Sequence, residues 1–574
     1  MMSAVMFVLV AGAVLLLLYL LNLVSQFLYK QECRVPVRDS SKGHHWVVVA
    51  AFPVGHYCNM CKLATSHGAM CDFCGLIVDR ACLKEAGKKY KCKQLSWMDA
   101  EDDIDRMQHH WVNGNLPPAS TCAVCEQICG DGPGIRDRRC CWCQRTVHTD
   151  CAPNLGRVCD FGEFRRIIVP PNCVVLKKLG WKARRATVIE KIETEIAMST
   201  IKNWSPIIVV ANRKSGNGDG ERVLEAFRLV LNPVQVIDLA EVQPCVGLRW
   251  CQLLSGIAEC RVLVAGGDGT VGWVLGAVEA LGLNPKPHIA LLPLGTGNDL
   301  SRALGWGSGH TASDINVIEI LRQIRRSVPV KLDRWNVQIT PRRRFGIRLP
   351  DKSFCMSNYL SLGVDAAVTL NFHNTRDTLP RAMSSRFINK MLFFTYGTQD
   401  VVERRCAGLS NYVQLSIDDK HVELPALEGI VILNIPQWGA GVEPWPMRSS
   451  LYSAASVHEH GCSDPPPPQS IDDGLLEVFG LYSSFHIAQL QVGVGEPYRI
   501  GQARSVTVRV FHRALPMQCD GEPWLQPPAV IRITHLGQAT LLASPEHAAR
   551  AAHITSSPEL SPTSDPGTSA PRFF

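Results

Sequence analysis

The chain has 574 residues, of which 46% are hydrophobic and 19% are charged. This length suits three or more domains, and this composition excludes a chain that is disordered throughout. The formal net charge of +7 is a mild basic excess, which suits an anionic membrane surface as well as a nucleic acid and does not choose between them.

An apolar segment without charged side chains runs from Ala4 to Val24. A helix of this length spans about 30 Å, roughly the hydrocarbon thickness of a bilayer. A cleaved signal peptide is the alternative, but no Lys or Arg precedes the segment and no small-residue cleavage site is evident. Lys30 and Arg34 follow it, so the positive-inside rule places the remainder in the cytosol. We expect a single membrane anchor at residues 4–24, in the endoplasmic reticulum or plasma membrane, with a re-entrant or interfacial segment as the other possibility.

Cysteines are concentrated near the N-terminus, where sixteen of the 23 precede residue 175. Many form Cys-x2-Cys pairs with histidines nearby, which favours metal ligands in a reducing compartment over disulfides. The clearest pattern spans residues 109–159 as His-x12-Cys-x2-Cys-x14-Cys-x2-Cys-x4-His-x2-Cys-x7-Cys. Six thiolates and two imidazoles supply two tetrahedral sites for structural Zn²⁺. The ligands are His109, Cys122, Cys125, Cys140, Cys143, His148, Cys151 and Cys159.

A weaker copy of this pattern occupies residues 45–92. Its two Cys pairs are only nine residues apart, its last gap is also nine residues, and Asp79 stands where the second histidine belongs. An aspartate can bind Zn²⁺ through oxygen, so the module can still fold around metal. The predicted ligands are His45, Cys58, Cys61, Cys71, Cys74, Asp79, Cys82 and Cys92.

Residues 160–204 form a linker with a basic stretch at Lys177–Arg185. The apolar residues of Ile189–Ile201 recur at helical spacing, which predicts a partly amphipathic helix. Such a stretch could contact anionic lipid, although a solvated face is the more common outcome.

Three polar, glycine-bearing turns then follow three apolar strands, within an α/β domain at residues 205–330. Strands that alternate with helices predict a parallel sheet, whose ligands bind at the carboxyl ends of its strands. Glycines let the backbone approach a phosphate closely, so the turns are predicted to converge on one nucleotide. The candidate nucleotide-binding residues are Asn212, Lys214, Ser215, Gly216, Gly266, Gly267, Gly269, Thr270, Gly295, Thr296, Gly297, Asn298 and Asp299.

Short β-branched segments such as Gly429–Ile435, Ser505–Val510 and Ala529–Thr534 predict a β-rich accessory domain at residues 331–542. Residues 442–470 contain His458, Cys462 and four consecutive prolines, which suits a surface insertion better than a metal site. The Ser-, Pro-, Thr- and Ala-rich tail at residues 543–574 is predicted to be disordered.

These motifs resemble eukaryotic diacylglycerol kinases from about residue 206 to 540, and the zinc pattern also resembles modules of protein kinase C. The resembling blocks include Gly-Gly-Asp-Gly-Thr at 266–270, Pro-Leu-Gly-Thr-Gly-Asn-Asp at 293–299, Asp-Asp-Gly-Leu-Leu-Glu-Val at 472–478 and Cys-Asp-Gly-Glu-Pro-Trp at 519–524. Two zinc modules after an apolar N-terminus are most similar to the epsilon type. The resemblance implies ATP with Mg²⁺, structural Zn²⁺, a diacylglycerol substrate taken from a membrane and no nucleic-acid partner; protein partners stay undetermined. It also implies interleaved ligand sets, with His109, Cys140, Cys143 and Cys159 on one zinc and Cys122, Cys125, His148 and Cys151 on the other.

The resemblance implies that Asp520 and Glu522 face the nucleotide turns across a cleft between the two domains. Phosphoryl transfer to an alcohol needs a proton acceptor, for which Asp268 and Asp520 are both candidates, while the turn geometry of Asp-Gly is the structural alternative for Asp520. Asp473 resembles part of a magnesium site. The expected product is phosphatidic acid, which would link diacylglycerol signalling to phosphoinositide resynthesis, and the epsilon resemblance implies a preference for arachidonoyl chains.

Two questions stay open from sequence alone. A sphingosine or ceramide kinase, or a non-catalytic diacylglycerol-binding scaffold, is the alternative function, and NAD kinase also has a Gly-Gly-Asp-Gly turn. The zinc modules either bind diacylglycerol or serve as a folded scaffold packed on the catalytic domain, and the second role is favoured because residues typical of the lipid groove are missing.

Overall fold

The computed structural model describes residues 43–52, 55–96, 107–178, 187–192, 201–310, 315–342, 350–378, 406–444 and 468–548. The expected anchor at residues 4–24, most of the insertion at 442–470 and most of the tail at 543–574 lie outside these ranges. Within these ranges, no helix has both the length and the hydropathy that crossing a bilayer requires.

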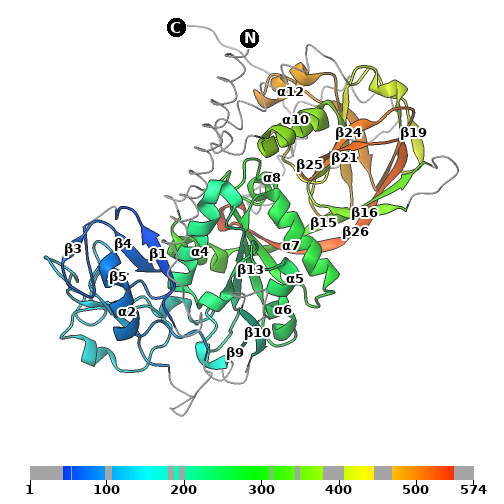
Figure 1. Ribbon diagram of the computed structural model, residues 1–574. Helices are drawn as coiled ribbons and strands as arrows, with labels where there is room; N and C mark the ends of the chain where they lie inside the picture. The colour runs from blue at the N-terminus through cyan, green and yellow to red at the C-terminus, as the bar shows by residue number, and fades with distance from the viewer. Residues whose placement is uncertain are drawn as a thin grey trace, which may run out of the picture.

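Two small cysteine-rich modules precede the catalytic part of the chain (Figure 1). Their strands are two to four residues long, too short to enclose large cores, so their folds depend on the sites that the cysteines form. The first module contains β1 (Trp46–Val49), β2 (His56–Tyr57), β3 (Ala64–Thr65), β4 (Gly68–Cys71), β5 (Ile77–Val78) and α2 (Leu83–Lys89). The second contains β6 (Trp111–Asn113), β7 (Arg138–Cys140) and β8 (Thr146–Val147).

The linker contains an antiparallel hairpin of β9 (Val174–Lys178) and β10 (Thr187–Ile192). The helix expected at Ile189–Ile201 is therefore wrong for its first residues, because Ile189 to Ile192 pair with β9. β-Branched residues are frequent in β10, and the partner strand decided an ambiguous apolar pattern.

The α/β domain is built on four parallel strands in the order β12-β11-β13-β14. All five residues of β11 and the last five of β13 are buried, because helices cover both faces of the sheet. The strands are β11 (Ile207–Ala211), β12 (Val236–Asp238), β13 (Arg261–Gly266) and β14 (His288–Pro293). The helices are α4 (Asp219–Val230), α5 (Pro244–Gly247), α6 (Arg249–Leu254), α7 (Asp268–Ala280), α8 (Asp299–Ala303) and α9 (Val317–Arg326).

A long two-stranded ribbon joins this domain to the β-rich domain (Figure 1). Its strands, β15 (Val328–Pro341) and β26 (Ala529–Ala543), pair antiparallel along their lengths, with a bulge between Arg334 and Trp335. One end of β26 pairs with β14, so the two domains share a single ten-stranded sheet. The chain thus returns to the α/β domain after completing the β-rich domain.

The β-rich domain packs this shared sheet against a separate six-stranded sheet of order β22-β21-β20-β17-β24-β25. Buried side chains from both sheets, including Trp335, Leu360 and Ile531, form its core. Its other strands are β16 (Lys352–Met356), β17 (Tyr359–Gly363), β18 (Val413–Ile417), β19 (Lys420–Val422), β20 (Gly429–Leu433), β21 (Leu476–Leu481), β22 (Tyr498–Ala503), β23 (Ser505–Val510), β24 (Leu515–Cys519) and β25 (Glu522–Gln526), and its helices are α10 (Val364–Thr378) and α12 (Ser484–Gln491).

The zinc modules and the α/β domain share one hydrophobic core, which runs from Trp46 and Trp142 to Phe227. Polar contacts reinforce this interface. The Lys93 ammonium donates to the carbonyls of Arg228, Leu229 and Leu231 at the end of α4, at 3.3, 3.2 and 2.8 Å. The modules are therefore packed as part of the catalytic body.

Candidate active site

The three glycine turns meet at the carboxyl edge of the parallel sheet, as the sequence predicts. An added Cβ at Gly267 would lie 3.2 Å from the Cα of Gly295, and one at Gly216 would lie 2.9 Å from the carbonyl oxygen of Leu294. Gly216 also has φ +61°, where glycine is favoured. Only residues without side chains allow three backbones to approach this closely, so the glycines build the site.

The turn after β14 is held in place by Asn298, which lies in the left-handed region with φ 55°. Its Nδ2 donates to the carbonyls of Gly295 and Ser308 at 2.7 and 2.9 Å, and its Oδ1 accepts from the Gly295 N–H. Asn298 thus shapes the turn from within. The adjacent Thr296 and Gly297 are half-buried on the same turn.

Asp268 lies where two of the turns join, at the first position of α7. Its carboxylate accepts from the N–H groups of Asp299 and Leu300 at 3.2 and 3.4 Å, so it touches the N-terminus of α8. Burial raises the pKa of Asp268, and these N–H groups oppose that rise by stabilising the anion. An added Cβ at Gly297 would lie 3.4 Å from the Asp268 Oδ2, which shows that the carboxyl faces the second turn.

Asp299 is a second carboxyl beside Asp268. Burial, and then the charge on Asp268, raise the pKa of Asp299 to about 7. Its Oδ1 is buried without a hydrogen-bond partner among the described residues. Two adjacent carboxyls with raised pKa values are typical of sites that bind a cation or move a proton.

The β-rich domain reaches this point through Asn358, in the turn between β16 and β17. The Asn358 side chain lies near Asp268 and lowers the pKa of that carboxyl, while the Asn358 Oδ1 is buried without a partner among the described residues. Asp520 holds this turn, because its carboxylate accepts from the N–H groups of Ser357, Asn358 and Tyr359 at 2.8, 2.7 and 3.1 Å. Asp520 therefore fixes the backbone of the turn that carries Asn358.

Asp520 has φ +49° and Gly521 has φ +85°, which makes the β24–β25 connection a tight Asp-Gly hairpin turn. Burial raises the pKa of Asp520, and its three backbone donors oppose that rise. Next to it, the exposed Glu522 points at α7, with its Oε1 3.3 Å from an added Cβ at Gly269. The structure thus brings Glu522 to the nucleotide turns, while both oxygens of Asp520 are used to shape the backbone.

Residues of the first turn occupy the remaining side of the site. The Asn212 Oδ1 accepts from the Lys214 N–H at 3.0 Å and closes the turn, and Lys214 itself is exposed. Ser215 and Gly216 follow in a short 3₁₀ helix. On the next turn, the Thr270 side chain packs over Gly266, where an added Cβ would approach it to 2.6 Å.

Asp473 does not join these groups. Its Oδ1 accepts from the Leu475 N–H at 2.9 Å, and burial raises its pKa with a further contribution from the charge on Asp333. In the part of the chain that the structure describes, the clusters able to hold a metal do not include Asp473. Asp473 closes a turn on its own backbone, and its magnesium role stays a prediction.

The ligand atoms of the second module fall into the two interleaved sets that the resemblance implies. Each set has its four donor atoms within 4.8 Å of one another, and the Cys140 and Cys159 sulfurs are 3.9 Å apart. Tetrahedral zinc with Zn–S bonds of about 2.3 Å requires sulfurs about 3.8 Å apart, so these sets fit structural Zn²⁺. The His148 Nε2 lies 2.9 Å from the Ile128 carbonyl, which orients the ring toward the cysteines.

The first module departs from the prediction at two ligands. His44, not His45, lies with Cys71, Cys74 and Cys92, at 3.5 Å from the Cys74 sulfur. His45 instead contacts the buried Asp72 at 2.7 Å, and Asp72 pairs with Arg228 of α4. His45 therefore belongs to the contact with the catalytic domain.

Asp79 is the second departure. Cys58, Cys61 and Cys82 form a three-thiol cluster, which fits zinc with one position left for another ligand. The Asp79 Oδ1 accepts from the Ala81 N–H at 2.9 Å and caps a short 3₁₀ helix, so the carboxylate is outside the cluster. A capping bond explains an aspartate at this position.

Sequence reasoning missed Tyr359, which follows the Asn358 turn. Burial, with the charges of Asp365, Asp299, Asp268 and Asp520, raises the pKa of Tyr359 well above its usual value. A tyrosine among four carboxyls stays protonated. Its only sequence signal is its place in the block 358–365, which resembles the kinases as a whole.

Comparison with known proteins accounts for most of the described chain. The diacylglycerol kinase catalytic domain family matches residues 206–332, and the diacylglycerol kinase accessory domain family matches residues 355–523. The family of phorbol ester/diacylglycerol binding domains, or C1 domains, matches residues 109–162. Diacylglycerol kinase 2 of Arabidopsis thaliana is 30% identical over 84% of this chain and 80% of its own length. The chain belongs to the diacylglycerol kinase family. Other kinases of the family differ more in length. Probable diacylglycerol kinase 3 of Caenorhabditis elegans is 32% identical over 88% of this chain, which spans 64% of that protein. Human diacylglycerol kinase iota is 32% identical over 82% of this chain, which spans 47% of that protein.

Two solved structures from Bacillus anthracis, one named a diacylglycerol kinase and one a putative diacylglycerol kinase, also align with this family member. They are 16% and 17% identical, with TM-scores of 0.34 and 0.35, and each covers 59% of this chain and 97% of its own.

Proposed function

We propose that this chain transfers the γ-phosphoryl group of ATP to the free hydroxyl of 1,2-diacylglycerol and releases phosphatidic acid at a membrane. The observation that carries the proposal is the position of Asp268, which lies between two glycine turns and contacts Asn358 of the opposite domain. Family membership supports the same reaction, because the matched catalytic and accessory domains are those that meet at this carboxyl.

In this proposal the glycine turns hold the triphosphate with backbone N–H groups, and Lys214 supplies a cation at the exposed side. Mg²⁺ would neutralise charge on the phosphates when bound. The carboxyl of Asp299 is a hard oxygen ligand that fits it, and the unpartnered Asp299 Oδ1 supports that assignment.

Of the two candidate bases, we favour Asp268. Its two hydrogen bonds are 3.2 and 3.4 Å long, whereas Asp520 accepts three bonds of 2.7 to 3.1 Å that hold its oxygens on the backbone. A base must be free to rotate an oxygen toward the substrate hydroxyl. Asp520 is then a positioning residue that fixes Asn358, and Glu522 adds negative charge at the cleft edge near Gly269.

The N-terminal segment and the zinc modules bear on where the enzyme acts and on which lipid it prefers. The anchor at residues 4–24 would keep the site at the endoplasmic reticulum or plasma membrane, and the product would feed phosphoinositide resynthesis. Two zinc modules after an apolar N-terminus support an epsilon-type enzyme with an arachidonoyl preference. The zinc modules serve as a scaffold, which their shared core with the α/β domain supports.

The test is a lipid-panel kinase assay on the purified full chain in mixed micelles with labelled ATP. We expect label in phosphatidic acid when diacylglycerol is added, and little with sphingosine or ceramide. Preferential labelling of sphingosine or ceramide would assign the chain to the alternative lipid kinases, and the absence of ATP consumption with every lipid would support a non-catalytic scaffold.

A further inference from the structure

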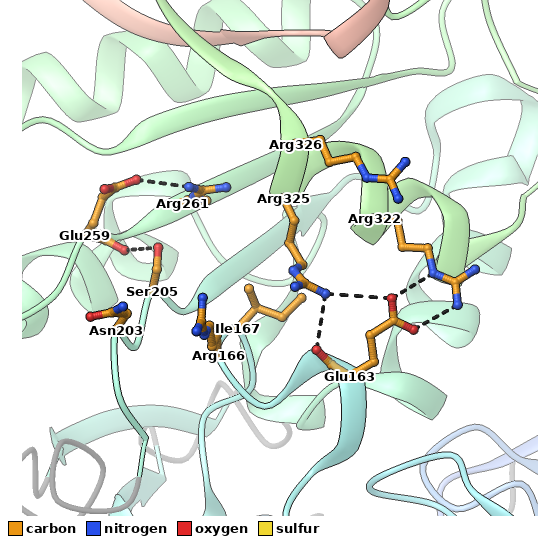
Figure 2. Close-up of a pocket in the computed structure, with 10 residues that line it drawn as sticks. All are labelled: Glu163, Arg166, Ile167, Asn203, Ser205, Glu259, Arg261, Arg322, Arg325 and Arg326. Carbon is orange, nitrogen blue, oxygen red and sulfur yellow. Dashed lines mark hydrogen bonds and ion pairs between the residues drawn. The ribbon is translucent and has the colours of Figure 1, made fainter.

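A basic pocket of about 470 Å³ lies between the linker and the α/β domain (Figure 2). Three segments that are far apart in sequence line it: the linker after the second zinc module, the start of β13 and the end of α9. Each contributes guanidinium groups, and this volume is within the range of small-molecule sites. The arginines are Arg166, Arg261, Arg322, Arg325 and Arg326.

This pocket is separate from the candidate active site. Ser205 and Arg261, which line it, precede or begin β11 and β13, whereas the glycine turns follow the carboxyl ends of the same strands. A six-residue strand is about 20 Å long, so the two sites are on opposite edges of the sheet. A ligand in the pocket would not contact the bound nucleotide.

Two glutamates neutralise part of the positive charge. Glu163 accepts two bonds of 2.8 Å from Arg322 and is 3.7 Å from Arg325, and Glu259 pairs with Arg261 at 3.3 Å (Figure 2). The Arg322 and Arg325 charges lower the pKa of Glu163, so it stays ionised. Five arginines against two carboxylates leave a net positive pocket.

The guanidinium donors without a hydrogen bond mark where an anion would bind. The exposed side chains of Arg166 and Arg326 have no hydrogen bond or ion pair to another side chain within the described ranges, and no dashed line reaches them in Figure 2. The Arg261 Nε is buried without a partner among the same residues, although its Nη1 donates to the Ile324 carbonyl at 2.9 Å. Accessible donors are thus left open on two of the segments that line the pocket.

We propose that this pocket binds a ligand carrying a phosphate monoester and thereby joins the linker to the catalytic domain. A phosphate monoester is a dianion near neutral pH with three free oxygens, and guanidinium forks bind such oxygens in pairs. A soluble phosphate ester and a lipid headgroup share this chemistry. The inference does not depend on the reaction proposed for the active site.

The test uses the full chain with its nucleotide turns filled by Mg²⁺ and a non-hydrolysable ATP analogue. Glycerol 3-phosphate is titrated by calorimetry, and flotation measures binding to phosphatidylcholine vesicles that contain phosphatidic acid or, as the phosphodiester control, phosphatidylglycerol. Binding of glycerol 3-phosphate in the calorimeter indicates a soluble ester as the ligand. Stronger flotation with phosphatidic acid than with phosphatidylglycerol indicates a lipid headgroup.

Paired variants decide whether the pocket is responsible. We expect Arg166→Gln/Arg326→Gln to lower the affinity about tenfold or more, because charge-assisted hydrogen bonds are lost. Glu163→Gln should raise the affinity, since Arg322 and Arg325 are released, and misfolding cannot produce such a gain. Arg509→Gln, on β23 of the other domain, is the matched control and should bind as the wild type does. The proposal is overturned if neither probe binds, if the double variant matches the control, or if Glu163→Gln binds no more tightly.

Discussion

Replacing Lys93 by methionine tests whether the zinc modules are a fixed part of the catalytic body. Methionine keeps most of the side-chain volume but removes the ammonium, which lies 4.5 Å above the Trp142 ring and donates to three carbonyls at the end of α4. The Leu229 carbonyl would keep a second donor, the Gln144 Nε2 at 3.2 Å, whereas the carbonyls of Arg228 and Leu231 would lose the only side-chain donor that the described residues show for them.

The expected loss follows from these contacts. Each buried carbonyl left without a partner costs about 1–3 kcal/mol. Part of this cost is offset, because burying the Lys93 charge is itself unfavourable and methionine removes that charge. Burial accordingly lowers the pKa of Lys93. We expect the free energy of opening at the end of α4 to fall by about 3 kcal/mol, which corresponds to about a hundredfold larger opening equilibrium constant.

Native-state hydrogen exchange measures this opening directly. The amides in the last turn of α4 should exchange about a hundredfold faster in Lys93→Met than in the wild type. Lys88→Met is the control, because Lys88 is exposed on α2 and pairs with the exposed Glu85, so its effect should stay within about 0.5 kcal/mol. If the two variants exchange alike, the modules do not depend on this buried cation and the reasoning is refuted.

The remaining predictions concern the site and the metal clusters. Asp268→Asn should lower kcat by about 10² to 10⁴, the usual contribution of a general base, while the circular dichroism spectrum is unchanged; turnover near the wild-type rate would remove Asp268 from the reaction. His44→Ala should lose one zinc by mass spectrometry and His45→Ala should keep it, because only His44 lies with the cysteines; equal zinc contents would contradict this assignment. Without Mg²⁺ and nucleotide, Asp299 binds a proton more tightly when folded than when unfolded, because its pKa is raised from 3.8 to about 7. Its contribution to stability should therefore fall as pH rises from about 4 to 7 and be constant above, and urea titrations of Asp299→Asn should lack this component.

Local features were predictable from the sequence because their causes are local. The strands before the glycine turns are apolar runs, and the structure places β11, β13 and β14 in these runs. The eight ligands of the second module were predictable from their spacing, whereas their division into two interleaved sets was implied by the resemblance to the kinases.

Contacts between distant segments were not predictable in the same way. Adjacent histidines at 44 and 45 fit the spacing almost equally, and only the fold shows that Asp72 engages the second. The role of Asn358 depends on a turn that Asp520 holds from a strand far along the chain. Likewise, Ile189 has an apolar pattern that serves a helix or a strand until its partner is known.

The ribbon of β15 and β26 limits how the active-site cleft can change its width. Both strands run without interruption from one domain to the other, so the hinge is a hydrogen-bonded ladder instead of a pair of loops. Swinging the domains apart would break ladder bonds, whereas torsion about the ribbon axis would keep them. The bulge beside Arg334 and Trp335, opposite Gly537 with φ +146°, is the softest point on that axis. Lipid entry and product release would then be coupled to a screw-like rotation, whose pitch is set by a single irregularity in strand pairing.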